Sequence, residues 1–143
     1  MGPIDNLSSV HFSWQEALWL PTYGRMATEA DGLDDTVRTQ LNILFTQMDK
    51  VRDYFNSPIN VHVAYRPTAY NALIGGAVDS AHIYGMACDF DIKGISCDDA
   101  RDKIIVDNKL EEWSMRMEKR PGSGWIHLDI RELLPNGNRY FLP

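Results

Sequence analysis

Two histidines and one aspartate stand out in this sequence because together they could hold a metal ion. His82 and Asp89 lie in one short segment, and His127 lies further along the chain. Three protein ligands with a fourth position left for water are typical of a catalytic zinc site, whereas a structural zinc site is usually closed by four ligands, mostly cysteines. Nitrogen and oxygen ligands suit Zn²⁺, although Mn²⁺ and other divalent ions also bind them. These residue types therefore favour metal-assisted hydrolysis.

The elements that must position these side chains are two strands and a loop. One strand is predicted over Met86–Ile92 and carries Asp89, and a second over Trp125–Ile130 carries His127. If the two strands pair, the alternation of side chains along each strand allows Asp89 and His127 to face the same side. We expect His82 to reach them from the loop before the first strand.

The spacing around these residues resembles the signature of the zinc D-alanyl-D-alanine carboxypeptidase and L-alanyl-D-glutamate peptidase family. Hedgehog signalling domains share the fold of this family. The matching positions are Ser80, His82, Gly85, Ala87 and Asp89, followed by Trp125 and His127. Tyr65, Arg66 and Asn71 are similar to the arginine-bearing strand end of the family. The likeness extends loosely from Phe12 to the C-terminus and is greatest to small phage-type members.

The resemblance implies a role for each matching side chain. His82, Asp89 and His127 would bind one zinc ion, and Arg66 would grip a carboxylate or carbonyl group of the substrate. A guanidinium suits that role because its planar fork binds a carboxylate bidentately and stabilises an oxyanion. A structural ion pair is the alternative for Arg66. Ser80 would bond either the substrate or a nearby backbone group, and the alternative is a loop hydroxyl with no special role.

The sequence departs from the family pattern at the expected general base, which takes a proton from water and passes it to the leaving amine. Many relatives place an acidic residue three positions before the last histidine, and here this position is Gly124. Glu118 is our first substitute, because the loop 120–124 could fold it back over the metal, and Asp129 is the second. The alternatives are a helix-surface position for Glu118 and, for Asp129, a hydrogen bond that orients a ligand imidazole.

The rest of the chain predicts an α+β fold of the hedgehog/DD-peptidase type, with a small antiparallel sheet flanked by helices in a single domain over residues 1–143. Ser13 and Glu16 form a capping box before a short helix. The longest helix begins at Asp34 or the next residue and carries an apolar stripe at three- and four-residue spacing. Further elements are expected as strands over 61–65 and 139–142, a short helix over 67–72, a helix after Ser96, and a helical segment over 110–119.

Composition and charge narrow the classes of function. The 143 residues carry a net charge of −6, which argues against non-specific nucleic-acid binding because such binding needs clustered Lys and Arg. The two cysteines, Cys88 and Cys97, exclude a disulfide framework and a cysteine-rich zinc cluster. We find no apolar run of membrane-spanning length and no secretory signal in Met1–Asn6, so we expect a protein made in the cytoplasm that does not act in a membrane.

Three functions remain open on this sequence. The first, which we favour, is a zinc metallopeptidase that cuts peptidoglycan stem peptides at the bacterial cell wall, as a carboxypeptidase or an endopeptidase, in a phage endolysin or a virion-associated lysin. The second is a catalytically inactive phage structural or adaptor protein that keeps the fold and contacts other virion proteins, and Gly124 favours it. The third is a metal-independent interaction domain, suggested only by Trp14, Trp19 and Tyr23.

Overall fold

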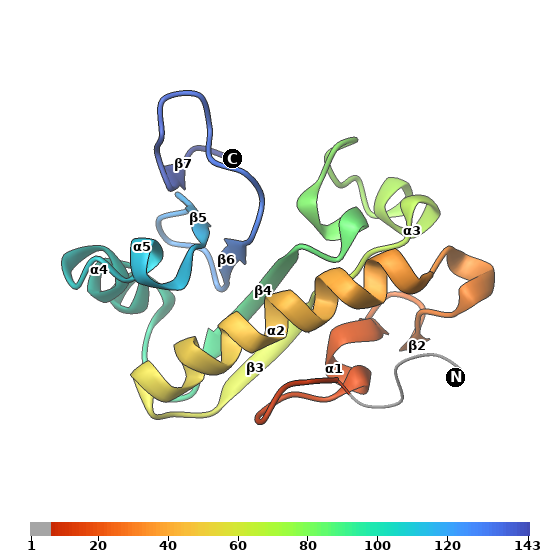
Figure 1. The fold of residues 1–143 in the computed structure, drawn as a ribbon, viewed down its shortest axis with the longest axis horizontal. Coiled ribbons are helices and arrows are strands. Elements are labelled where there is room, and N and C mark those ends of the chain that lie inside the picture. The colour runs from red at the N-terminus through yellow and green to blue at the C-terminus, as the bar shows by residue number, and fades with distance from the viewer. Residues whose placement is uncertain (1–6) are drawn as a thin grey trace.

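Helices and strands are mixed along this computed structural model, which describes residues 7–143 (Figure 1). The helices are α1 (Trp14–Leu18), α2 (Asp35–Phe55), α3 (Thr68–Leu73), α4 (Cys97–Val106) and α5 (Lys109–Trp113), with the 3-10 turns η1 (Glu29–Asp31) and η2 (Ala81–Tyr84). The strands are β1 (Trp19–Leu20), β2 (Arg25–Met26), β3 (Ile59–Val63), β4 (Ala87–Ile92), β5 (Arg116–Glu118), β6 (Ile126–Asp129) and β7 (Tyr140–Phe141). The predicted α+β fold is confirmed.

The predicted long helix is α2, and its ends follow from local chemistry. The Asp34 carboxylate accepts a hydrogen bond of 2.9 Å from the Val37 amide, which caps the first turn. Asn56 adopts a left-handed conformation and ends the helix. In Figure 1, α2 crosses β3 and β4. Its apolar stripe belongs to the same buried cluster as Cys88 and Phe90 of β4, so the helix covers one face of the sheet.

The main sheet has the strand order β3-β4-β6-β5-β7. β4 lies between β3 and β6 and pairs antiparallel with both. β5 also pairs antiparallel with β6, but it pairs parallel with β7. The prediction of an antiparallel sheet is therefore correct except at this edge. A separate two-stranded hairpin, β1 with β2, was not predicted, because each of its strands has only two residues.

The predicted helical segment over 110–119 is wrong in its second half. α5 ends at Trp113, Ser114 takes a left-handed φ of 55°, and Arg116–Glu118 forms β5. Burial explains the change, because Met115 and Met117 alternate along an extended chain and are both fully buried in the core. The consequence for the site is that Glu118 lies on a strand beside β6.

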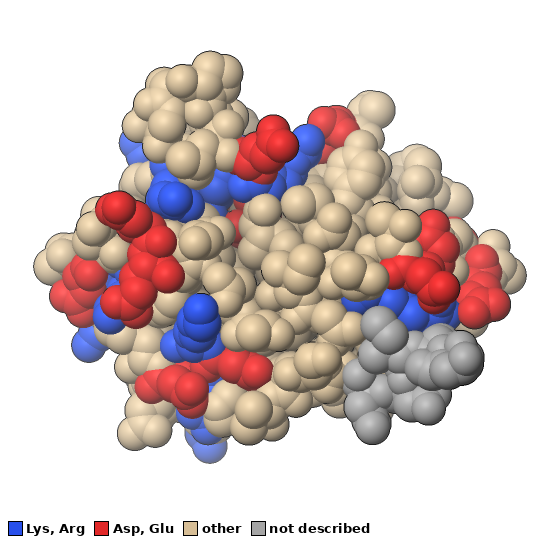
Figure 2. Space-filling view, in the orientation of Figure 1, with Lys and Arg blue, Asp and Glu red and all other residues tan. Residues whose placement is uncertain are grey.

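Charged side chains are distributed unevenly over one face of the molecule. Figure 2 shows acidic groups over α4 and α5 and around the beginning of α2, with basic groups beside them. Neither sign forms a continuous band across the part of this face that the structure describes. No helix among residues 7–143 is long and apolar enough to cross a membrane. Residues 1–6, on which our expectation about a secretory signal depends, lie outside the described part of the chain.

Candidate metal centre

A row of three polar side chains crosses the middle of the sheet, one from each of three neighbouring strands. Asp89 of β4 is directly opposite His127 of β6. On the other side of β6, Met117 of β5 is opposite Leu128. One further step in this antiparallel register brings Glu118 beside His127. Because side chains alternate along a strand, the row projects from the sheet face opposite the hydrophobic core.

His82 joins this row from η2, so the three side chains predicted as metal ligands come together. One nitrogen of each histidine and one oxygen of Asp89 all lie within 4.8 Å of one another. The Oδ1 atom of Asp89 is 3.1 Å from Nε2 of His82 and 2.9 Å from Nδ1 of His127. Each of the three residues is less than a tenth exposed. The group therefore forms a compact, nearly dry set of nitrogen and oxygen donors.

The position of His82 follows from the turn that carries it. The Ser80 hydroxyl caps η2 by accepting a hydrogen bond of 3.2 Å from the His82 amide. The turn ends at Gly85, which has a φ of 71°. A Cβ atom at Gly85 would lie only 3.1 Å from Val37 of α2, so both the backbone conformation and the close packing favour glycine. The spacing of Ser80, His82 and Gly85 therefore reflects a short turn that Ser80 caps and Gly85 ends.

The hydrogen bonds of His82 prepare one ring nitrogen for a cation. Its Nδ1 atom lies 2.6 Å from the backbone oxygen of Ala64, which can only accept, so Nδ1 carries the proton. In the neutral ring, Nε2 then presents a lone pair, and it has no hydrogen-bond partner among the described residues. That lone pair faces an oxygen of Asp89. Two electron-rich atoms in contact are stabilised by a cation between them, so the donor set fits Zn²⁺.

His127 is held from the opposite direction by a carboxylate. Its Nε2 atom lies 2.9 Å from Oδ2 of Asp129, which leaves Nδ1 facing Asp89. Burial disfavours a charged imidazole, but the hydrogen bonds to Asp129 and Asp89 outweigh that cost and raise the pKa of His127 to about 9. Asp129 is fully buried and also accepts two hydrogen bonds, of 2.7 and 3.0 Å, from Arg116. Asp129 is thus placed to orient the imidazole of His127.

Arg66 lies beside the Asp89 carboxylate and is itself held in place. Its Nη2 atom donates to Oδ2 of Asp89 at 3.4 Å, and its Nη1 atom donates to Asn71 at 3.0 Å. Asn71 is buried and also donates a hydrogen bond of 2.8 Å to the backbone oxygen of Ala77. A Cβ atom at Gly76 would lie 2.1 Å from the Asn71 side chain. The loop that contains Gly76, which we call the glycine loop, therefore packs closely against Asn71. Asn71 in turn holds the Arg66 guanidinium in place.

The metal group opens into a cavity of about 210 Å³. The lining residues are Arg66, Gly75, Gly76, Ala77, Ser80, His82, Asp89, Glu118, Arg120, Trp125 and His127. Arg120 was not predicted, because it stands in a loop with no pattern around it. Trp125 belongs to the motif Trp125-x-His127, but no role was predicted for its side chain. Its ring lies beneath the Arg120 guanidinium, with 5.2 Å between Cζ and the ring centroid.

The two candidates for a general base have different surroundings. Glu118 lines the cavity from β5, and its carboxylate accepts a hydrogen bond from Nε of Arg120. Asp129 does not line the cavity, because it is bonded beneath His127. Apart from the two residues next to it in the chain, no described residue lies within 4 Å of a Cβ atom built at Gly124, so the absence of a side chain there is not imposed by packing around the Cβ position. Glu118 is thus the carboxylate that borders both the metal group and open space.

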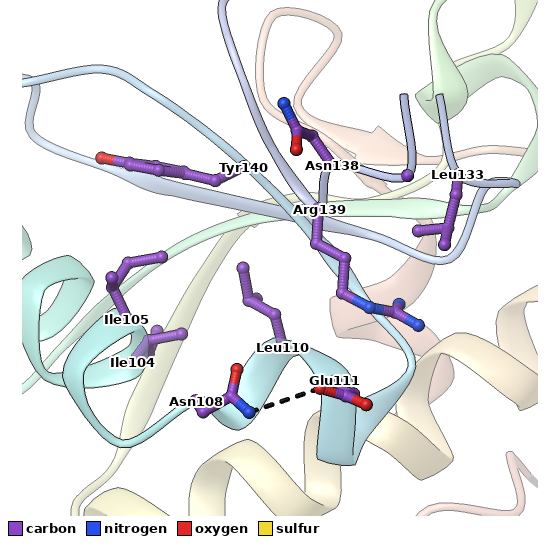
Figure 3. A pocket seen from close by; sticks show the side chains of 10 residues that line it. Ile104, Ile105, Asn108, Leu110, Glu111, Leu133, Asn138, Arg139 and Tyr140 are labelled. Atoms are coloured by element: carbon purple, nitrogen blue, oxygen red, sulfur yellow. Dashed lines mark hydrogen bonds between the residues drawn. The ribbon is translucent and has the colours of Figure 1, made fainter. Parts of the chain in front are cut away.

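Other polar groups lie apart from this site. His62 and Asp91 bond each other and do not line the cavity. Figure 3 shows a separate cavity of about 640 Å³ between α4, α5 and the C-terminal segment. In it Asn108 donates to Glu111 at 3.3 Å, and Arg139 is the basic side chain. With one carboxylate and no histidine or cysteine in its lining, this cavity offers no set of metal ligands.

A family model described as peptidase M15 matches residues 22–129, which include every residue of the metal group and the cavity. No curated protein gives a significant match.

Proposed function

Because this chain belongs to the peptidase M15 family, we propose that it is a zinc-dependent peptidase that hydrolyses peptidoglycan stem peptides. The observation that carries the proposal is the buried, unpartnered Nε2 atom of His82, which faces Asp89 beside His127. With His82 neutral, its Nε2 lone pair and the Asp89 oxygen face the same space, which suits a cation between them. The nearby cavity offers room for a substrate group.

The ligands of the zinc ion would be Nε2 of His82, a carboxylate oxygen of Asp89 and Nδ1 of His127. When bound, zinc supplies Lewis acidity that polarises a carbonyl group and makes water more acidic. Asp129 would hold His127 in the correct tautomer through its Nε2 hydrogen, and Ala64 would do the same for His82 through Nδ1. Each imidazole would then keep one fixed orientation toward the metal.

Glu118 would act as the general base. It would take a proton from the attacking water and deliver it to the nitrogen of the leaving amine, so that the peptide bond breaks without a free amide anion. Its position on a strand beside His127 supports this role, because a strand side chain is held more firmly than one on a loop. Arg66 would add positive charge beside the substrate while its terminal nitrogens stay bonded to Asn71 and Asp89, and Ser80 would keep η2 in shape.

A second candidate is an inactive phage structural or adaptor protein that keeps the metal site and contacts other virion proteins. The observation in its favour is Gly124, which stands where many relatives carry an acidic residue. The presence of Glu118 in the cavity favours the enzyme, because a carboxylate is still available beside the metal group.

Digestion of muropeptides tests the two candidates. The purified chain is loaded with Zn²⁺, incubated with muropeptides released from cell-wall sacculi, and the products are identified by mass spectrometry. We expect stem-peptide fragments that disappear when a chelator is added and return with excess Zn²⁺, and their masses also identify the bond cut. A metal-loaded, folded protein that leaves every muropeptide intact would favour the inactive protein.

A further inference from the structure

The cavity contains two arginines whose surroundings differ. Arg66 is 13% exposed, and both of its terminal nitrogens donate to protein oxygens, on Asn71 and Asp89. Arg120 is 39% exposed and donates to Glu118 through Nε. Within residues 7–143, its two terminal nitrogens have no hydrogen-bond acceptor. The outward fork of Arg120 is thus free to bind a ligand, whereas that of Arg66 is occupied.

The orientation of Arg120 is set by Trp125. The guanidinium lies over the indole ring, a contact that combines stacking with cation–π attraction and leaves the edge of the guanidinium open. Trp125 is in turn anchored, because its backbone oxygen accepts a hydrogen bond of 2.6 Å from the buried Arg101. An exposed arginine would otherwise lose considerable side-chain entropy on binding a ligand. The contact with the indole ring already restricts the guanidinium and so lowers that loss.

The charge of the cavity favours an anionic ligand. The positive charges of the two arginines and the negative charges of the Asp89 and Glu118 carboxylates sum to zero when both histidines are neutral, as metal ligands must be. A bound divalent cation then leaves an excess of two positive charges in a confined space. A peptide that carries a carboxylate near the cut bond matches this excess, whereas the same peptide as an amide does not.

From this arrangement we propose that Arg120 determines specificity by binding a free carboxylate of the peptide substrate. The proposal depends on the peptidase function proposed above. The ion pair with Glu118 is the resting state of the arginine, and a partly exposed pair of this kind is weak enough to exchange. When the substrate carboxylate takes its place, Arg120 stays on Trp125 and Glu118 is released to accept a proton.

Kinetics with matched substrates test this role. The zinc-loaded protein is given a synthetic stem peptide with its carboxylates free, the same peptide with a C-terminal amide, and one with its acidic side chain amidated. For the carboxylate that Arg120 binds, we expect Arg120→Gln to raise KM by about tenfold to a hundredfold, the usual value of a charge-assisted hydrogen bond. The peptide in which that carboxylate is amidated should have the same KM with the Arg120→Gln variant and with the wild-type protein. The amidated peptide that behaves in this way identifies the carboxylate that Arg120 binds.

Two further variants complete the test. Arg120→Lys keeps the positive charge but not the planar fork of the guanidinium. Its KM for the acid peptide should therefore lie between the values for the wild-type protein and for Arg120→Gln. Arg139→Gln removes an arginine from the separate cavity of Figure 3 and should leave KM unchanged. For each amidated peptide, the KM is compared with that of the peptide with free carboxylates. The proposal would be overturned if this ratio is the same in Arg120→Gln and in the wild-type protein.

Direct binding separates this proposal from the proposed function. In Glu118→Gln the competing carboxylate is absent, so calorimetry should show tighter binding of the acid peptide than in the wild-type protein, and Arg120→Gln added to this variant should abolish the gain. If wild-type protein cuts no peptide but this pattern of binding is observed, the peptidase function is wrong and the role of Arg120 stands. If peptides are cut but the pattern is absent, the role of Arg120 is wrong.

Discussion

Asp89 and His127 face each other across two antiparallel strands, with 2.9 Å between Oδ1 and Nδ1, although 38 residues separate them in the sequence. The sheet therefore holds two of the three proposed ligands in a fixed relation, and only the third comes from a turn. Because η2 is fastened to α2 by the close packing of Gly85, all three positions depend on the folded core. The site should accordingly be preformed before metal binds.

Replacing His82 with alanine should remove bound zinc. The variant keeps only two protein ligands, whereas a catalytic zinc site normally has three. Zinc content after dialysis, measured by atomic emission, should fall from one ion per chain to near zero. His62→Ala is the matched control, because this histidine lies in the same sheet but outside the cavity, and it should keep its zinc. A folded His82→Ala protein that retains one zinc per chain would disprove the ligand assignment.

Replacing Glu118 with glutamine should abolish activity without removing the metal. Glutamine keeps the shape of the side chain but cannot accept the proton, and loss of a general base typically lowers kcat by about 10²- to 10⁴-fold. Zinc content and the circular dichroism spectrum should stay unchanged. Glu111→Gln, in the separate cavity of Figure 3, should have normal activity. Normal turnover in Glu118→Gln would assign the base to another group.

The elements that were predicted best are those with strong local signals. The capping box of Ser13 and Glu16 and the apolar stripe of α2 are patterns within one segment, and both are present as expected. The motif around His82 also reports local structure, since Ser80 caps the turn and Gly85 ends it. Sequence could therefore place His82 and Asp89 relative to each other.

The features that sequence could not predict depend on contacts between distant segments. Leu110, Trp113 and Met117 are spaced as on a helix, so nothing local revealed that the chain turns at Ser114 and joins the sheet. The partner of Asp129 is Arg116, which is visible only once β5 and β6 are paired. For the same reason Glu118 could be named as a base, but its strand could not be foreseen.

Asp98 should make stability depend on pH through the loop that carries Arg120. Its carboxylate accepts hydrogen bonds from the Gly122 amide at 2.9 Å and from Arg101 at 2.6 Å, and these hold the pKa of Asp98 below its usual value. A carboxyl group with a lowered pKa in the folded state stabilises the protein above its unfolded pKa of about 3.9 and loses that effect as the pH falls.

The urea midpoint of Asp98→Asn should accordingly be lower than that of the wild-type protein at pH 7, and the two should converge as the pH falls below about 4. Asp102→Asn, on the same helix, is the control and should match the wild-type protein at each pH. A difference for Asp98→Asn that is as large at pH 3 as at pH 7 would show that its hydrogen bonds do not depend on the carboxylate charge.

Asn71 should matter for both stability and activity, because it joins Arg66 to the glycine loop. Asn71→Ala removes the acceptor of a terminal nitrogen of Arg66 and the donor to the backbone oxygen of Ala77, both in partly buried hydrogen bonds, which should cost about 1 kcal/mol and lower the Tm by a few degrees. Asn71→Asp keeps an acceptor for Arg66 but cannot donate to Ala77. If both bonds contribute, its Tm should lie between that of the wild-type protein and that of Asn71→Ala. Zinc content should be unchanged in either variant, while KM rises because Arg66 is no longer fixed. Asn60→Ala, at an exposed position on β3, is the control. If Asn71→Ala has the same Tm and KM as this control, Arg66 is positioned by Asp89 alone.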